Sequence, residues 1–256
     1  MGANTTNIDD EVDFYRVRSE LLTSNVFFQF NLTPQIKAGV GPGFDFVKIL
    51  NRSEASFLDP QNLDFSNPTK FGTLKSYLNI SFLDNNLNPK TGFKWENSAD
   101  FFSEFGGDQD NFVRLSSAVT AYGTPNIALP LRVALKLGTQ TNIGDYKFFQ
   151  ANFIGNNNNL RGFRNQRFGG RTTYFANTEV RLPISSFRNY VFTGDFGFYG
   201  FYDVAKINNN EIIKSEWQQG YGPGIWVNVY NKLLLSVGYG FSKEGRLFSF
   251  NTGFAF

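Results

Sequence analysis

Bulky apolar residues alternate with small or polar ones through the second half of this sequence. In residues 233–242, the bulky set is Leu233, Leu235, Val237, Tyr239 and Phe241, and the residues between them include Ser236, Gly238, Gly240 and Ser242. Residues 173–182, 191–204, 220–230 and 248–256 show the same pattern. Successive side chains of a strand point to opposite faces of its sheet, so a period of two predicts strands with one bulky face and one small or polar face.

The first half of the sequence contains segments of the same kind, separated by turn residues. They cover residues 12–22, 26–32, 36–50, 72–82, 93–105, 112–123 and 131–141. Together with the five later segments they predict about twelve strands and an all-β fold. The composition agrees, because 18% of the 256 residues are aromatic and 31 are Phe, a residue that strands favour.

Composition also excludes several classes of function. The chain has no Cys and no His, which removes thiol nucleophiles, disulfides, the usual zinc sites and histidine acid–base chemistry. A net charge of +2 without a basic stripe gives no support for nucleic acid as a partner. We expect no cofactor, no metal site and no catalytic residues, because the carboxylates and lysines that remain do not cluster.

The polar face of the strands separates a membrane barrel from a soluble sandwich, although the period alone does not. That face is made of Gly and Ser with isolated charges, which suits a wet lumen, whereas the outer face of a soluble sheet would be dense in Lys and Glu. Strands of about 10 residues also match the length needed to cross hydrocarbon at a tilt. The sequence therefore predicts a closed antiparallel transmembrane β-barrel over residues 12–256, preceded by a polar leader at residues 1–11.

The connections between the predicted strands alternate in length. Residues 33–35, 84–92, 124–129, 183–190 and 230–232 are short, and residues 51–70, 106–111, 155–171 and 206–216 are longer. Short periplasmic turns and longer extracellular loops are typical of outer-membrane barrels, and an even strand number returns both termini to one side. The junction at residues 23–25 is the exception, because it would lie on the long-loop side.

One of the long connections, residues 154–170, is rich in Gly and Asn and contains Arg161, Arg164 and Arg167. Loops of this length are usually functional or disordered. If the loop folds into the lumen, Arg161 meets the inward faces that bear Glu179 and Asp203, where a bidentate pair is strong. The alternative is that Arg161 is an ordinary solvated loop arginine.

The two residues after Arg161 fit the same arrangement. Gly162 permits a close approach of two backbones, and Phe163 is expected to pack on lumen aromatics such as Tyr199 or Phe201. Arg181 and Asp195 are read as lumen charges with a structural role.

Three motifs and the C-terminus resemble one known family. They are Leu160-Arg161-Gly162-Phe163, the segment from Asn177 to Pro183, Phe201-Tyr202-Asp203-Val204-Ala205, and a last strand that ends in Phe256. In this order they resemble the C-terminal barrel of the outer-membrane assembly and translocation superfamily of bacterial surface antigens, which includes BamA, TamA and FhaC. The resemblance implies the same arrangement, in which the loop folds into the lumen and Arg161 contacts Glu179 and Asp203. The chain departs from the family's usual 16 strands and preceding POTRA domains, and Ala205 stands where the family tends to have Gly.

The last predicted strand has a second interpretation besides lipid contact. Phe250, Phe254 and Phe256, which the alternation places on the lipid-facing side with Phe248, are candidates for a C-terminal signal that an insertion machinery reads. The first strand, with Asp13, Arg16, Arg18 and Glu20, has few large apolar residues and should seal poorly against the last. A weak seam of this kind is what a lateral gate needs; the alternative is a seam stabilised by a second copy in a homodimer.

These features together predict an integral protein of the Gram-negative outer membrane. The implied role is non-catalytic: insertion or translocation of a protein or lipid client through the lumen or the lateral seam, with outer-membrane lipids as partners. Two alternatives stay open. One is a small passive pore that the loop plugs, and the other is a membrane anchor for a catalytic domain in a longer protein.

Overall fold

The computed structural model describes residues 18–50, 68–106, 110–155, 159–188, 193–209 and 216–254. Apart from one short 3-10 helix, η1 (Phe148–Gln150), its elements are strands: β1 (Arg18–Asn25), β2 (Phe28–Thr33), β3 (Ile36–Leu50), β4 (Thr69–Leu83), β5 (Gly92–Phe105), β6 (Asn111–Gly123), β7 (Arg132–Gly144), β8 (Asn152–Ile154), β9 (Phe168–Gly170), β10 (Thr172–Arg188), β11 (Thr193–Asn208), β12 (Gln218–Val229), β13 (Leu233–Ser242) and β14 (Gly245–Thr252). The all-β prediction is confirmed. No helix in these ranges is long and apolar enough to cross a membrane.

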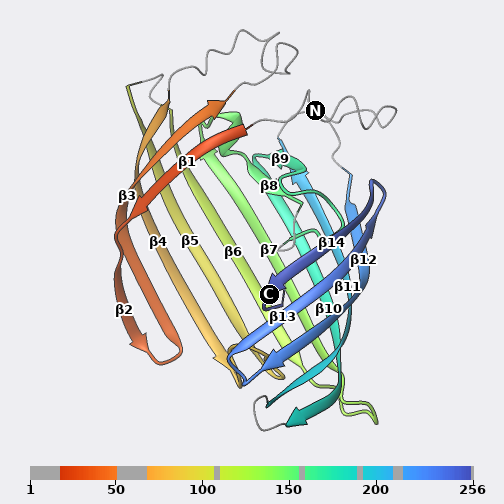
Figure 1. The fold of residues 1–256 in the computed structure, drawn as a ribbon. Coiled ribbons are helices and arrows are strands. Elements are labelled where there is room, and N and C mark those ends of the chain that lie inside the picture. Colours follow the sequence, from red (N-terminus) through yellow and green to blue (C-terminus); the bar gives the residue numbers. More distant parts are fainter. Residues whose placement is uncertain are drawn as a thin grey trace.

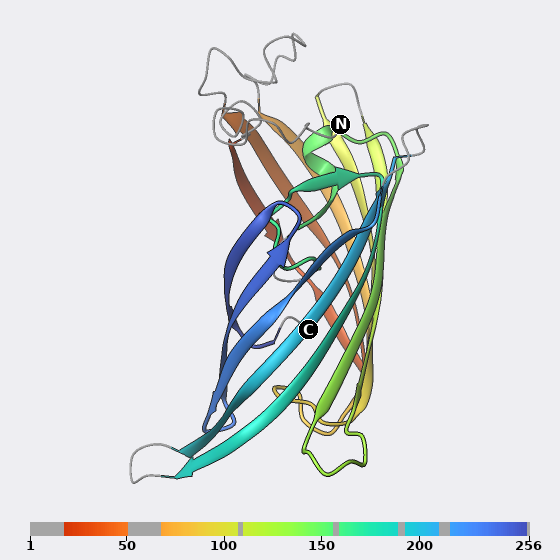
Figure 2. The same cartoon turned by 90° about the vertical axis from the view of Figure 1, so that its right-hand side faces the viewer.

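Twelve of the strands form one antiparallel sheet, and β8 and β9 form a separate two-stranded sheet. Neighbours in the large sheet follow one another along the chain, except that β7 pairs with β10 across the long loop. The strands tilt and the sheet curls into a trough, with β8 and β9 in its hollow near one end (Figures 1 and 2). The turns that join β2 to β3, β4 to β5 and β12 to β13 lie at the opposite end of the trough (Figure 1).

The ring is not closed by hydrogen bonds among the described strands, in contrast to the predicted closed barrel. β14 pairs with β13 alone, and β1 and β2 each pair with β3 alone. At only 8 residues, β14 is about half as long as β10 and β11, which have 17 and 16. The sheet therefore has two free edges, one along β1 and β2 and one along β14.

The first two strands correct the sequence prediction, which counted residues 12–22 and 26–32 as two separate strands with a junction at residues 23–25. Both lie on the same edge of β3, with Asn25 opposite Gly43 and Phe28 opposite Val40, so they are two halves of one interrupted strand. The interruption faces Pro42, which lacks an N–H and accepts instead from the Val26 N–H at 3.1 Å.

The interruption also changes the parity of the sheet. Eleven strands follow one another across the sheet. The twelfth, β2, pairs with the same edge of β3 as β1 does, so twelve strands occupy eleven positions. β1 begins opposite Leu50 at the long-loop end, whereas β14 ends opposite Leu235 near the short-turn end. The start of β1 and the end of β14 thus lie at opposite ends of the trough, whereas the even strand number predicted that both termini return to one side. Residues 1–17, which contain the predicted leader and the start of the predicted first strand, lie outside the described residues.

The two faces of the sheet differ as the alternation predicts. On β11, Phe196, Phe198 and Tyr202 are exposed on the convex face. Tyr199, Phe201 and Asp203, which alternate with them along the strand, are buried on the concave face. The concave face contains two aromatic clusters, one formed by Phe71, Phe102 and Phe112 and one by Tyr199, Phe201 and Trp226. Bulky side chains thus cover the convex side of β11, and its buried Asp203 lies on the concave side.

The orientation of the faces predicts opposite responses to a new charge. Phe198→Arg places a charge on the convex face near the middle of β11, where Phe198 is 55% exposed. We expect it to lower the free energy of unfolding in phospholipid vesicles by about 2–4 kcal/mol, because hydrocarbon penalises a charge at that depth. Gln140→Arg on the concave side of β7 is the matched control and should cost far less. Equal losses in urea titrations of the two variants would contradict this orientation.

Candidate functional site

The loop between β7 and β10 is attached to the sheet at its root. Its first turn, η1, lies against the wall formed by β5, β6 and β7: Lys147 Nζ donates to Glu104 Oε1 at 2.7 Å, and the Gln150 carbonyl accepts from Asn142 Nδ2 at 2.8 Å and from the Arg114 guanidinium. β8 and β9 then pair in a short hairpin, with Asn152 opposite Gly170. A polar loop was expected here, and part of it is thus a hairpin that holds the root in place.

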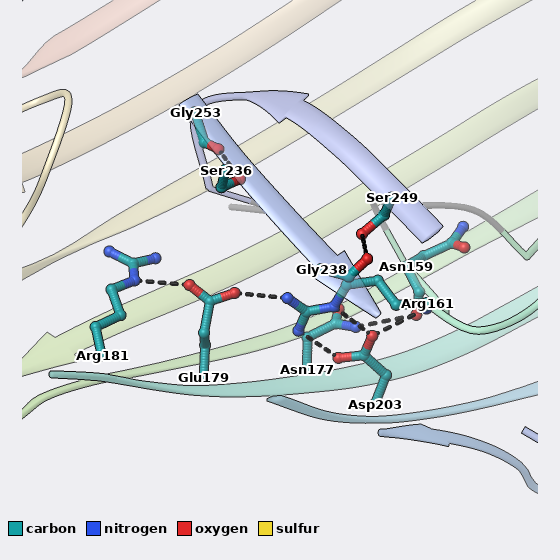
Figure 3. A network of polar contacts seen from close by, with 10 residues as sticks. All are labelled: Asn159, Arg161, Asn177, Glu179, Arg181, Asp203, Ser236, Gly238, Ser249 and Gly253. Carbon is teal, nitrogen blue, oxygen red and sulfur yellow. Dashed lines mark hydrogen bonds and ion pairs between the residues drawn. The ribbon is translucent and has the colours of Figure 1, made fainter. Parts of the chain in front are cut away.

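The tip of the loop places Arg161 on the concave face of β10 and β11 (Figure 3). The guanidinium donates from Nε to Asp203 Oδ2 and from Nη2 to Asp203 Oδ1, each at 2.8 Å, and from Nη1 to Glu179 Oε2 at 2.6 Å. The backbone N–H of Arg161 also donates to Asp203 Oδ2, at 2.9 Å. The side chain of Arg161 is 2% exposed and those of the two carboxylates 0%, so the solvated alternative does not describe this arginine.

The strand register explains why both carboxylates reach one arginine. Asp203 of β11 lies opposite Asn177 of β10, and Phe201 lies opposite Glu179. Glu179 and Asp203 are therefore diagonal neighbours on one face of an antiparallel pair, within reach of a long side chain. Between them the guanidinium of Arg161 lies over the Phe201 ring, 3.8 Å from its centroid.

Glycines on two further strands let the loop backbone come close to the sheet. Gly162 has a φ of +88°, and its carbonyl accepts from Ser242 Oγ at 2.8 Å. A Cβ at Gly240 would lie 2.7 Å from the Gly162 nitrogen, and one at Gly220 would overlap the Arg161 carbonyl. The close approach of the loop backbone to β12 and β13 thus requires that residues 162, 220 and 240 are all glycine.

Phe163 packs elsewhere than predicted. It joins Ile154, Leu160 and Ala205 in a cluster beneath the hairpin, and its ring centroid lies 5.5 Å from that of Phe168. Tyr199 and Phe201 belong to the separate cluster with Trp226, so the predicted packing partners were wrong. The cause is the turn at Gly162, which directs the next side chain toward the root of the loop. Ala205 is fully buried in this cluster, so its methyl group fills space beside Phe163.

Arg181 extends the network to the C-terminal end of the sheet. Its Nε donates to Glu179 Oε1 at 2.7 Å, so Glu179 bridges two buried arginines. The guanidinium of Arg181 lies 3.4 Å from the centroid of the Phe254 ring. Two arginines and two carboxylates balance in formal charge. The sequence suggested a structural role for Arg181 but contains no sign of its contact with Phe254.

The position of Phe254 corrects the prediction that it faces lipid. Phe250 and Phe248 are 64% and 78% exposed on the convex face, but Phe254 turns inward onto Tyr199, Trp226 and Arg181. The cause is Gly253, whose φ of +110° follows the end of β14. Its N–H donates to the Leu234 carbonyl at 2.7 Å and its carbonyl accepts from Ser236 Oγ at 2.6 Å. Phe256, the third candidate signal residue, lies outside the described residues.

Comparison with known proteins places the sequence in a family. The family model described as the Omp85 superfamily domain matches residues 3–256. The chain belongs to the Omp85 superfamily. No curated protein sequence matches it.

A solved structure shows the same fold for this Omp85 domain. The crystal structure of BamA from Haemophilus ducreyi lacking POTRA domains 1–3 superposes with a TM-score of 0.69 at 14% identity. The match covers 92% of this chain and 55% of the BamA chain, so the Omp85 domain described here spans about half the length of that structure. The superfamily and the fold together make it a BamA-like outer-membrane β-barrel domain.

The buried contacts of Arg161 predict a large effect of its removal from this Omp85 domain. Arg161→Ala leaves Glu179 with one arginine and Asp203 with none, and breaking a buried ion pair in this way costs about 3–5 kcal/mol. We expect a lower midpoint of the heat-induced mobility shift in gels and faster trypsin cleavage near residues 164–167. Arg164→Lys, at an exposed position of the same loop, keeps a trypsin site there and is the control. Equal behaviour of the two variants would show that Arg161 does not anchor the loop.

The inward turn at Gly253 predicts unequal roles for two phenylalanines. Phe254→Ala should destabilise the domain more than Phe250→Ala, by about 1–2 kcal/mol, because it removes a desolvated cation–π contact with Arg181. Urea titrations of both variants in vesicles of one lipid composition measure the difference. A greater loss for Phe250→Ala would mean that the C-terminal end lies on the lipid face as the alternation alone suggests.

Proposed function

We propose that this Omp85 domain is a non-catalytic barrel of the bacterial outer membrane that inserts or translocates a polypeptide or lipid client. The carrying observation is the anchored loop tip, in which Arg161 contacts Asp203 and Glu179 inside the trough. A loop that only fills space could do so with apolar packing, which avoids the desolvation of buried charges. A bidentate charge pair instead fixes the position and direction of the loop tip. A defined loop position is what we expect if the interior of the trough must admit and release a client.

The free edges of the sheet support the lateral route. Among the described strands, none pairs with the outer edge of β1 and β2 or with the outer edge of β14, so each edge presents a row of backbone N–H and C=O groups. Hydrocarbon cannot satisfy such groups, so another strand must pair with them in a membrane. A client strand that enters between these edges would meet the need while it is being inserted. A homodimer, in which a second copy pairs at the same edges, is the alternative partner.

The character of the site supports binding over catalysis. Within the described ranges no group of three or more His, Cys, Asp or Glu side chains could hold a metal ion. The two carboxylates at the loop tip, Glu179 and Asp203, are fully buried and accept hydrogen bonds from arginines at 2.6–2.8 Å. Groups held in this way act as structural anchors, and they leave no free acid–base pair beside the loop tip.

The proposed function is tested by reconstitution of the domain into phospholipid vesicles. The probe is an eight-stranded outer-membrane barrel protein unfolded in urea and diluted into the vesicles, with its folding followed by the gel mobility shift. We expect the wild-type domain to accelerate folding of the probe several-fold over empty vesicles. Arg161→Ala should lose most of the acceleration, and Arg164→Ala should retain it.

Two outcomes would contradict the proposal. One is the absence of acceleration by a wild-type domain that has itself folded in the vesicles. The other is a large, steady ion conductance in planar bilayers that Arg161→Ala leaves unchanged, which is the behaviour of a passive pore. An analytical ultracentrifugation run in detergent distinguishes a monomer from a homodimer in the same preparation.

A further inference from the structure

A groove crosses the convex face of the sheet over β10, β11 and β12. Its volume is about 510 Å³, and Val180, Gly200, Tyr202, Tyr221, Pro223 and Phe241 are among the residues that line it. Gly200 lies near the middle of β11, which runs from Thr193 to Asn208, so the groove is at mid-height. None of the residues that line it carries a charge.

The strand register explains why a groove forms here. Gly200 lies opposite Pro223, so two residues with little outward side chain are neighbours on adjacent strands. Tyr202 lies opposite Tyr221 on one side of this pair, and Phe198 lies opposite Ile225 on the other. All four flanking side chains are exposed on the convex face. Of these four, Tyr202 and Tyr221 line the groove, and the Gly200–Pro223 pair beside them leaves the sheet surface low, which forms a trench.

The pairing of β12 with β13 is interrupted at the same place. Paired positions run from Gly220 to Tyr221 and resume at Gly224, so Gly222 and Pro223 have no paired partner on β13. Pro223 cannot donate to a ladder, which accounts for part of the gap. At the wall of the groove beside this gap, Tyr221 stacks on Phe241 with ring centroids 5.9 Å apart. The trench thus has a backbone floor that is looser than the ladders around it.

One residue connects the groove with the loop tip on the other side of the sheet. Phe201 is among the residues that line the groove, and its ring lies on the concave face, where a Cβ at Gly222 would lie 3.1 Å from it. The concave side of the same ring supports the guanidinium of Arg161 at 3.8 Å. An occupant of the groove would therefore be separated from Arg161 by the backbone of β11 and by the Phe201 ring.

We propose that this groove binds an acyl chain of a membrane phospholipid. It is continuous with the exposed apolar surface of the convex face, which includes Phe196, Phe198, Ile225 and Val237. Its mid-height position puts it beside the hydrocarbon chains and away from the headgroups. The uncharged lining, with aromatic walls and a glycine floor, suits a flexible apolar chain and offers no cation or anion to a headgroup. The inference rests on the membrane location proposed above and is independent of the role of the loop.

Fluorescence quenching by a brominated lipid tests the site. A tryptophan reporter is introduced as Tyr221→Trp, in a background where the exposed Trp95 and Trp217 are replaced by Phe. The probe is phosphatidylcholine brominated at the middle of its acyl chains, added to the folded domain in detergent at about one lipid per protein. We expect at least twofold stronger quenching for this reporter than for Leu137→Trp, because both positions are 54% exposed on the convex face but only Tyr221 borders the groove.

Filling the groove gives the second arm of the test. A Cβ at Gly200 would have no heavy atom within 4 Å, so Gly200→Leu adds a side chain to the groove without a clash. Quenching of the Tyr221→Trp reporter should then fall to the level of the Leu137→Trp reporter. Equal quenching of the two reporters in proteins that keep Gly200 overturns the proposal, and this comparison decides it even if Gly200→Leu fails to fold. Quenching that persists in a folded Gly200→Leu protein also overturns it.

Discussion

The structure depends on a neutral row of buried charges that crosses the concave face of the sheet. Asp203, Arg161, Glu179 and Arg181 follow one another at hydrogen-bond distances of 2.6–2.8 Å. Each charge needs its neighbour, because an isolated ion in this buried setting would be far less stable than one in water. Asp203 accepts from the backbone as well as from the side chain of Arg161, so the row fixes both the place and the direction of the loop tip.

The loop that bears Arg161 also bridges two walls of the trough. The root of the loop contacts the β5–β7 wall through Lys147 and Gln150, and its tip lies against the wall from β10 to β13 through Arg161 and Gly162. The loop therefore crosses the interior from one wall to the other. At the far end of the row, Arg181 lies on Phe254, just after β14 and its free edge. Loop position and C-terminal position are thus connected through shared contacts at Glu179.

The sequence predicts the features that follow from local periodicity and misses those set by single residues. Alternation gives the faces of β11 correctly, and it puts Glu179 and Asp203 on the face that the loop reaches. It cannot reveal that Pro42 interrupts the edge strand, since β1 and β2 each read as a strand. It also continues the last strand past Gly253, where a positive φ turns Phe254 inward. Gly162 redirects Phe163 in the same way. A period describes a regular backbone, and these residues are where the backbone stops being regular.

The most direct test of the account is the hydrogen exchange of the Arg161 backbone amide, resolved by residue in lipid bilayers. That N–H donates to a fully buried carboxylate, so the account predicts exchange as slow as that of the β10 and β11 amides, and a large acceleration in Asp203→Ala. Exchange of the Arg161 amide as fast as that of the exposed Arg164 would contradict it, because the loop tip would then be open to water and the row of charges would not hold it.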